Sequence, residues 1–389
     1  MTPLELERYL ADCRDLTLQE LREIIPQDTR CGSTLYNLML DYPLRAAKGL
    51  RPALCVATCR ALGGSLEAVL RSAAALELYH NAFLIHDDVE DGSETRRGRE
   101  TLHRTHGTPI AVNVGDAMLA LALQPLLDNL RLVGLGKALR ILQTIARMAR
   151  ESSEGQAIEL DWIRRRRWDL ADADYIRMVY KKSSWYTFIT PVTIAAIVAG
   201  LERERLRPLR SFAALLGIAF QIQDDVLNLV GEGGRYGKEI AGDLWEGKHT
   251  LVVMHMMRSA NPADRERARD ILSRPRPNRG GPSAADREAL ASLLARLHEE
   301  GELSAGARRA IERWCRESGG TTGPPKAAAD IQLLLTLIDR HASIDHARAV
   351  ARRYAQRAQA LLERADWLRP SVHRDFLHGL VDFVVIRDR

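Results

Sequence analysis

Three aspartates lie close together at the end of a long apolar segment. Asp87, Asp88 and Asp91 follow the run AAALELYHNAFLIH. Residues four apart share one face of a helix, so Asp87 and Asp91 would present two carboxylates in the same direction, with Asp88 beside them. Their charges repel one another and the negative end of the helix dipole, so they need a cation nearby. Because Mg²⁺ commonly combines one or two carboxylates with phosphate oxygens, this cluster predicts a magnesium site.

A second acidic cluster repeats this design. Asp224 and Asp225 end the segment LLGIAFQIQDD, and Asn228 stands four residues after Asp224. Two such clusters that face each other across a cavity could hold several Mg²⁺ ions around a diphosphate, whose oxygens would complete each coordination shell. A solvated acidic helix end accounts for one isolated cluster, but not for two of the same design.

Basic residues accompany both clusters. Arginine presents paired donors to a phosphate, lysine presents a point charge, and glycine lets the backbone approach a ligand closely. Together these groups exceed what one diphosphate requires, so the sequence predicts two anionic substrates in one cavity. The candidate residues are Lys48, Arg51, His80, Arg96, Arg97, Lys238 and Lys248.

The elements that would position these groups are helices. Apolar residues recur at three- and four-residue spacing along almost the whole chain, alternating patterns are scarce, and aromatic residues make up only 5% of the sequence. The predicted fold class is therefore all-α. Helices are predicted near residues 4–24, 34–45, 50–62, 66–91, 109–131, 135–165, 172–200, 203–231, 250–259, 263–273, 284–299, 304–317, 326–341, 343–365 and 371–383.

Two stretches rich in glycine, proline and arginine interrupt the helical pattern, at residues 273–283 and 317–325. This composition favours surface connections. Residues 1–389 are therefore predicted to form a single domain with a peripheral helical insertion at about 275–325.

The formal net charge of +5 suits anionic ligands. The basic run Arg164–Arg167 has no interleaved aromatic residues, so no nucleic-acid partner is expected. The uncharged stretch Ser183–Leu201 is interpreted as a buried core helix, so no stable membrane insertion is expected. No signal peptide is recognisable, and the five cysteines follow no disulfide or zinc pattern. These features predict a cytoplasmic protein.

Several motifs in combination resemble one known family. They are KGLRP at 48–52, ELYHNAFLIHDDVEDGSETRRG at 77–98, the pair Lys182-Ser183, FQIQDDVLN at 220–228 and GKEIAGDLWEGKHT at 237–250. The sequence resembles the trans-isoprenyl diphosphate synthases, also called polyprenyl synthetases, and within them looks closest to bacterial geranylgeranyl diphosphate synthases. The resemblance covers residues 40–260 and resumes near 326.

The resemblance implies a single-domain isoprenoid synthase bundle of a dozen or more helices around a central cavity, assembled as a homodimer. It implies a prenyltransferase that joins isopentenyl diphosphate to an allylic diphosphate head to tail. The allylic substrate would ionise, the two substrates would condense, and a proton would then be eliminated. About three Mg²⁺ ions would serve as the cofactor.

The resemblance also assigns roles to individual residues. The implied metal ligands are Asp87, Asp88, Asp91, Asp224 and Asp225. Asn228 replaces the usual third aspartate of the second cluster, so it offers an amide oxygen but no charge. The implied isopentenyl diphosphate site consists of Lys48, Arg51, His80 and Arg97. The implied allylic diphosphate site consists of Arg96, Lys182, Lys238 and Lys248. The implied catalytic residues are Lys182, Ser183 and Gln221.

Product length in this family depends on side chains just before the first cluster. Tyr79, Ala82 and Phe83 precede Asp87 by eight, five and four residues. A small Ala82 beside Phe83 predicts a tunnel that is open beyond the farnesyl (C15) length but not fully open. The expected product is geranylgeranyl diphosphate (C20), with C25 as the alternative.

Two other functions fit part of this pattern. A class I terpene cyclase would use an aspartate cluster and Mg²⁺ but would not need a second diphosphate site. A non-catalytic partner subunit of a prenyl synthase would tolerate the loss of site residues. Magnesium-dependent turnover by the protein alone separates an enzyme from such a subunit.

Overall fold

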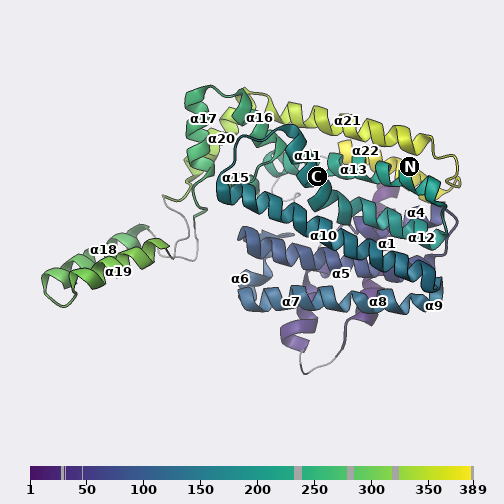
Figure 1. Ribbon diagram of the computed structural model, residues 1–389, viewed down its shortest axis with the longest axis horizontal. Helices are drawn as coiled ribbons and strands as arrows, with labels where there is room; N and C mark the ends of the chain where they lie inside the picture. The colour runs from purple at the N-terminus through teal and green to yellow at the C-terminus, as the bar shows by residue number, and fades with distance from the viewer. Residues whose placement is uncertain are drawn as a thin grey trace.

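The computed structural model describes residues 1–27, 30, 32–45, 47–231, 239–277, 284–317 and 324–386. Nearly all regular structure in these residues is helical, which confirms the predicted all-α class (Figure 1). The first half contains α1 (Pro3–Ile24), η1 (Gly32–Tyr36), α2 (Asn37–Met39), α3 (Asp41–Leu44), α4 (Leu50–Ala61), α5 (Leu66–Asp91), α6 (Leu102–His106), α7 (Thr108–Leu121), α8 (Leu123–Asp128), α9 (Leu130–Val133), α10 (Leu135–Arg165), α11 (Asp172–Val179) and η2 (Tyr180–Ile189).

The second half of the chain adds further helices around this bundle (Figure 1). They are α12 (Thr190–Ala199), α13 (Arg203–Val230), α15 (Gly242–Glu246), α16 (Leu251–Ser259), α17 (Pro262–Leu272), α18 (Ala284–Glu299), α19 (Ala305–Glu317), α20 (Ala328–Arg340), α21 (Ser343–Glu363) and α22 (Val372–Ile386). In Figure 1, α18 and α19 lie side by side as an arm to the left of the main body, within the predicted insertion.

Helix α5 carries the first acidic cluster through the middle of the bundle. The Ser65 hydroxyl accepts a hydrogen bond from the Ala68 N–H at its start, and Gly92 in the left-handed conformation ends it. Every residue from 72 to 82 is buried, so this part of the helix has no solvent face. The cluster therefore emerges directly from the protein core.

A short β-hairpin follows α5. Strands β1 (Thr95–Arg96) and β2 (Arg99–Glu100) pair antiparallel, and the two turn residues Arg97 and Gly98 have φ of 52° and 75°. A two-residue turn with positive φ at both positions matches the twist of a hairpin. Arg45 donates hydrogen bonds to the carbonyl oxygens of Arg96 and Glu100, both at 2.8 Å, and so holds the hairpin against the bundle.

The single helix predicted at 172–200 is in fact three segments, with the π-helix η2 between α11 and α12. Two glycines let neighbouring helices approach η2 closely. A Cβ added at Gly155 of α10 would lie 2.2 Å from the Lys182 backbone nitrogen, and one at Gly217 of α13 would lie 2.8 Å from the Ser184 Cβ. Extended π-helical geometry is rare and often occurs at functional sites. Here it lies at the Lys182-Ser183 pair.

Two other helix predictions also differ from the structure. Residues 34–45 form η1, α2 and α3, and residues 109–131 fall in α7, α8 and α9. The short helices α6 and α15 and the hairpin were not predicted. They are too short to show a helical or strand period in the sequence.

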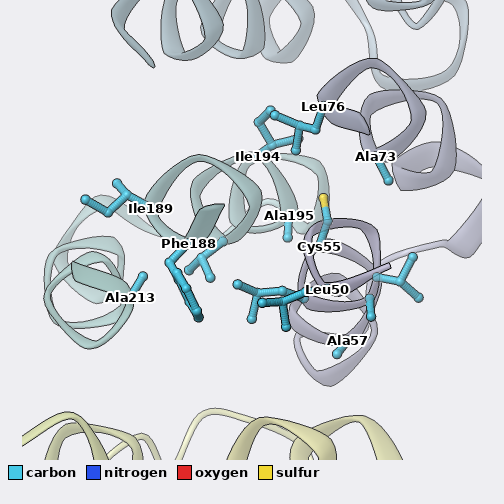
Figure 2. Close-up of a cluster of buried hydrophobic side chains, with 14 of the residues drawn as sticks. Leu50, Cys55, Ala57, Ala73, Leu76, Phe188, Ile189, Ile194, Ala195 and Ala213 are labelled. Carbon is cyan, nitrogen blue, oxygen red and sulfur yellow. The ribbon is translucent and has the colours of Figure 1, made fainter. Parts of the chain in front are cut away.

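Buried apolar side chains form two clusters that α13 connects. The first half of α13 contributes to the cluster that contains residues of α1, α4, α5 and α12, and the second half contributes to the cluster that contains residues of α16, α20 and α21. Figure 2 shows part of the first cluster, with Leu50 and Cys55 of α4 and Phe188 and Ile189 of η2 among the buried side chains. Among the described helices, two stretches, Thr108–Val133 and Arg203–Val230, could span a membrane by length and composition alone, and the second is mostly buried core.

Candidate active site

Most of the predicted site residues meet at one cavity of about 440 Å³, although Asp91 of the first acidic cluster does not line it. Its walls come mainly from α5, η2 and α13, with contributions from the β-hairpin, the start of α4 and the segment before α16. The predicted residues that line it are Lys48, Arg51, His80, Asp87, Arg96, Arg97, Lys182, Ser183, Gln221, Asp224, Asp225 and Lys248. Lys238 lies outside the described residues.

Lysines occupy the space beside the first acidic cluster. The Lys248 Nζ lies 2.7 Å from Asp91 Oδ2 and 2.8 Å from Glu246 Oε2. Burial nevertheless raises the pKa of Asp91 to about 7, and the ammonium of Lys248 only partly offsets this. Additional positive charge near Asp91 would favour its ionised form.

Lys182 belongs to the same network of charges. Its Nζ lies 2.5 Å from Glu159 Oε2 and 3.3 Å from Asp87 Oδ1. Although burial opposes it, the charges of Asp87 and Glu159 raise the pKa of Lys182, so the ammonium stays charged. Glu159 of α10, within the sequence EGQAIELD at 154–161, was not predicted as a site residue.

Asp88 does not line the cavity, unlike its neighbour Asp87. It is fully buried, where it accepts a 2.6 Å hydrogen bond from the Tyr42 hydroxyl and forms an ion pair with Arg96. Consecutive helical residues point about 100° apart, so Asp87 and Asp88 cannot share a face. The structure therefore places Asp88 as the support of Arg96, and its role as a direct metal ligand stays a prediction that this arrangement does not favour.

The second cluster also contains one aspartate with protein partners. Tyr175 donates to Asp225 Oδ2 at 2.6 Å, and Gln221 donates to Asp225 Oδ1 at 2.8 Å. Burial raises the pKa of Asp225 to about 7, and the two hydrogen bonds offset only part of that shift. Asp224 is half-buried and lines the cavity beside it. Tyr175 was not predicted as a site residue.

Asn228 is buried outside the main cavity. Its Oδ1 accepts a 3.1 Å hydrogen bond from the Asp243 N–H, so the amide oxygen is already used to hold the turn before α15. Asp243 itself lines the main cavity. The structure thus brings the Asp243 carboxylate to the site through Asn228, and Asp243 is a further acidic residue that was not among the predicted ligands.

The acidic residues fit Mg²⁺ when phosphate oxygens complete its coordination. Across the described part of the chain, no group of three or more His, Cys, Asp or Glu side chains could hold a metal ion by itself. Mg²⁺ sites on phosphorylated substrates need only one or two carboxylates, which each cluster provides. Burial raises the pKa of Asp91 and of Asp225, so a bound cation would favour the ionised form of both carboxylates.

A second set of basic residues, which we call the basic wall, also lines the cavity and consists of Lys48, Arg51, His80 and Arg97. Arg51 donates to the Thr187 hydroxyl at 2.9 Å and lies over the Tyr186 ring, 4.6 Å from its centroid. The Arg97 guanidinium donates to the Tyr42 carbonyl oxygen at 2.6 Å. Burial, with neighbouring arginines, lowers the pKa of Arg97 to about 10, because Glu77 only partly compensates. This wall can therefore accept an anion of its own.

A second, smaller cavity of about 290 Å³ shares Leu84, Asp87, Lys182 and Tyr186 with the first. It lies between α5, α7 and α10, and Phe83 and Leu119 contribute apolar walls. Ala82 does not line this cavity and is fully buried in the core, so its role in product length stays a prediction. Tyr79 does not line the cavity either and contacts Phe83 edge to face.

Comparisons with known proteins agree with this site. Residues 33–283 match the family model described as polyprenyl synthetase. The chain is 34% identical over 270 residues to a short chain isoprenyl diphosphate synthase of Methanothermobacter thermautotrophicus, covering 69% of this chain and 80% of that protein. A similar protein of Methanocaldococcus jannaschii is 33% identical over 254 residues, covering 65% of this chain and 74% of its own length.

Solved structures show the same fold. The geranylgeranyl pyrophosphate synthetase of Pyrococcus horikoshii superposes with a TM-score of 0.75 at 26% identity, covering 98% of this chain and 99% of that one. A polyprenyl synthase of Caulobacter crescentus, complexed with calcium and isoprenyl diphosphate, also gives 0.75, at 25% identity, covering 100% of this chain and 98% of that one. Curated relatives are named for products of several lengths: geranylgeranyl, geranylfarnesyl and octaprenyl diphosphate.

An all-helical bundle with paired acidic clusters over one cavity defines a prenyltransferase of the metal-dependent trans-prenyl diphosphate synthase class. The chain belongs to the polyprenyl synthetase family. The family predicted from the sequence motifs is confirmed, and the relatives are named as synthases rather than terpene cyclases.

Proposed function

We propose that this cavity joins isopentenyl diphosphate to an allylic diphosphate, head to tail and with Mg²⁺. The observation that carries the proposal is that two sets of cations line the cavity, one for each of two anion sites. Lys182 and Lys248 lie beside Asp87 and Asp91, and Lys48, Arg51 and Arg97 form the second set. A terpene cyclase needs only the first of these sites.

The allylic diphosphate belongs on the acidic side. About three Mg²⁺ ions, held by Asp87, Asp91, Asp224 and Asp225, would neutralise the diphosphate as it leaves. Lys182, Lys248 and Arg96 would bind its remaining oxygens, with Lys238 as a further predicted contact. Arg96 is fixed in place by Asp88, and Lys182 is held by Glu159, so both cations are positioned before substrate arrives.

Isopentenyl diphosphate belongs on the basic wall. Lys48, Arg51, His80 and Arg97 would hold its diphosphate, and Tyr186 stacks beside both Arg51 and His80. This places the second substrate next to η2, which carries Lys182 and Ser183. Holding both substrates in one cavity raises their effective concentration for reaction.

In the proposed reaction the C–O bond of the allylic diphosphate breaks and diphosphate leaves. The double bond of isopentenyl diphosphate then attacks the allylic carbon and forms the new C–C bond. Loss of one proton, which the released diphosphate can accept, restores a double bond. Gln221, Ser183 and Phe220 also line the cavity, and its apolar walls would keep water away from the allylic cation.

We propose geranylgeranyl diphosphate as the main product. The second cavity begins beside Asp87 and Lys182, where the allylic tail would enter, and Phe83, Leu119 and Tyr186 narrow it. Mass spectrometry of products from isopentenyl diphosphate, Mg²⁺ and farnesyl diphosphate tests this assignment. A C20 product supports it, whereas a dominant C25 or longer product would contradict the proposed length but not the reaction.

We also propose a homodimer. Seven large apolar residues within residues 112–139 are exposed: Val112, Leu123, Leu127, Leu130, Leu132, Leu135 and Leu139. An apolar face of this extent along α7–α9 and the start of α10 suits a second copy of the chain.

We also propose a cytoplasmic protein. Cys13, Cys55 and Cys59 are buried free thiols, which fits the reducing cytoplasm.

A further inference from the structure

A groove with five arginines lies on the far side of η2 from the catalytic cavity. It has a volume of about 690 Å³ and runs between α10, η2 and α13. Arg140 and Arg147 of α10 face it from one side, and Arg203, Arg207 and Arg210 of α13 face it from the other. The described residues that line it include no aspartate or glutamate.

Most of these arginines lack an acidic partner. Only Arg147 forms an ion pair, at 3.6 Å with Glu151, among the described residues. The other four form no ion pair with a described carboxylate, although many surface arginines of this chain do. Burial, together with Arg147, lowers the pKa of Arg210, so the guanidiniums repel one another. An anion in the groove would relieve this repulsion.

The floor of the groove is apolar and aromatic. Trp185 is 1% exposed, and the guanidiniums of Arg147 and Arg210 lie 4.8 and 5.4 Å from its ring centroid. The Trp185 Nε1 is buried and makes no hydrogen bond with the described residues. Ile189 and Ile197 lie beneath the arginines, each almost fully buried. The groove therefore combines a cationic rim, an apolar floor and a spare N–H donor.

We propose that this groove is a second ligand site, which binds a diphosphate that carries an apolar tail. Paired guanidiniums from two helices match the oxygens of a diphosphate, and the tail would lie along Trp185, Ile189 and Leu206. A flat bilayer surface fits less well, because the apolar residues lie at the bottom of a concave site and not at its rim.

The groove shares a wall with the catalytic cavity. Tyr180, Trp185 and Ile189 of η2 face the groove, whereas Lys182, Ser183 and Thr187 of the same segment face the catalytic side. A ligand in the groove would thus contact the element that positions Lys182. The choice of a tailed diphosphate rests on the proposed function, but the site itself rests only on the arginines and their surroundings.

Binding to the whole protein, measured by calorimetry in EDTA, tests the proposal without turnover. The probes are inorganic diphosphate, geranylgeranyl diphosphate and vesicles containing phosphatidylglycerol. The groove variant is Arg147→Gln with Arg207→Gln, and the control is Arg150→Gln with Arg205→Gln. Both variants remove one arginine from α10 and one from α13, but Arg150 and Arg205 do not line the groove.

The groove variant should weaken one diphosphate-binding step at least tenfold, and the control should bind like the wild type. Geranylgeranyl diphosphate should bind this site more tightly than inorganic diphosphate. Ser211→Glu, which adds a negative charge to an exposed lining residue without removing packing, should weaken the same step. Equal binding by all variants, equal loss in both double variants, or binding to vesicles alone would overturn the proposal. Because these binding measurements do not require catalysis, a negative result would argue against the groove site and not against the proposed reaction.

Discussion

The Lys248 ammonium lies 2.7 Å from the carboxylate of Asp91, although 157 residues separate them in sequence. The segment before α16 thus closes onto the end of α5 and supplies a positive charge to the first acidic cluster. Lys182 does the same for Asp87 from η2. The cavity is organised as carboxylates with cations held beside them, ready to be shared with metal ions and a diphosphate.

The two adjacent aspartates of the first cluster should behave differently when each is changed to asparagine. Asp87→Asn removes a carboxylate from the cavity, so turnover should fall by at least about 100-fold while stability hardly changes. Asp88→Asn breaks a buried ion pair with Arg96, so the free energy of unfolding should fall by about 3–5 kcal/mol. Steady-state kinetics, which measure turnover, and urea unfolding, which measures stability, distinguish the two variants. Asp116→Asn, at an exposed site on α7, serves as the control.

Loss of a basic-wall residue should affect one substrate selectively. Arg51→Gln should raise KM for isopentenyl diphosphate by about 10- to 100-fold, since one charge-assisted contact is worth roughly 1.5–3 kcal/mol. KM for the allylic substrate should change little. Arg60→Gln, which removes a surface arginine from the same helix, is the matched control. Equal increases in both KM values would show that the two anion sites are not separate.

A smaller side chain at Phe83 should lengthen the product. Phe83 lines the second cavity, so Phe83→Ala opens the path along α5 and should shift the main product by at least one C5 unit. Phe212→Ala makes the same truncation in the core, away from this cavity, and should lower stability without changing product length. Mass spectrometry of the products checks both. An unchanged product from Phe83→Ala would mean that the tail does not follow this cavity.

The charge state of His249 should make stability depend on pH. Burial lowers the pKa of His249 from 6.5 to about 4. The stability that the neutral ring contributes to the folded protein is therefore fully present above pH 6.5. It is lost as the pH falls from 6.5 through about 4. Between pH 7 and pH 5 the free energy of unfolding should fall by about 2 kcal/mol, because each pKa unit corresponds to about 1.36 kcal/mol.

Urea unfolding at the two pH values measures this loss. His249→Phe keeps an aromatic ring against Trp168, on which His249 stacks at 4.0 Å, but removes the titration. The variant should lose less stability than the wild type on going to pH 5. Identical losses would contradict the assignment, and the exposed His106→Gln should match the wild type.

The proposed dimer should depend on the apolar face of α7–α9. Leu127→Asp places a charge at a residue that is 54% exposed, so it should convert the dimer to a monomer. Light scattering at micromolar protein concentration measures this change in mass. Val372→Asp, at an equally exposed residue on α22, should leave the mass unchanged. A wild-type protein that is monomeric under these conditions would contradict the proposal.

The sequence predicted much of this architecture because local signals and packing agree. Helix α5 spans the predicted residues 66–91, and the cavity gathers most of the predicted residues from positions 48 to 248. These signals are local: a period of 3.6 residues and charges next to apolar runs. Helix period and spacing also placed both aspartate clusters at the ends of helices.

The structural features that were not predicted from the sequence depend on tertiary packing. The π-helix η2 arises where Gly155 and Gly217 bring two helices against it, and no local pattern encodes that approach. Glu159, Tyr175 and Asp243 reach the site from other elements. The full burial of Ala82 follows from how α5 packs against its neighbours, which no local pattern in the sequence encodes. The groove beyond η2 collects arginines from two helices that are distant in sequence.

The stoichiometry of the reaction tests the central claim most directly. Purified protein is supplied with both substrates and Mg²⁺, and the initial rates of diphosphate release and isopentenyl diphosphate consumption are measured together. We predict one diphosphate released for each isopentenyl diphosphate consumed, with both rates abolished by EDTA and restored by added Mg²⁺. Diphosphate release without consumption of isopentenyl diphosphate, or no turnover at all, would contradict a two-substrate site in this cavity.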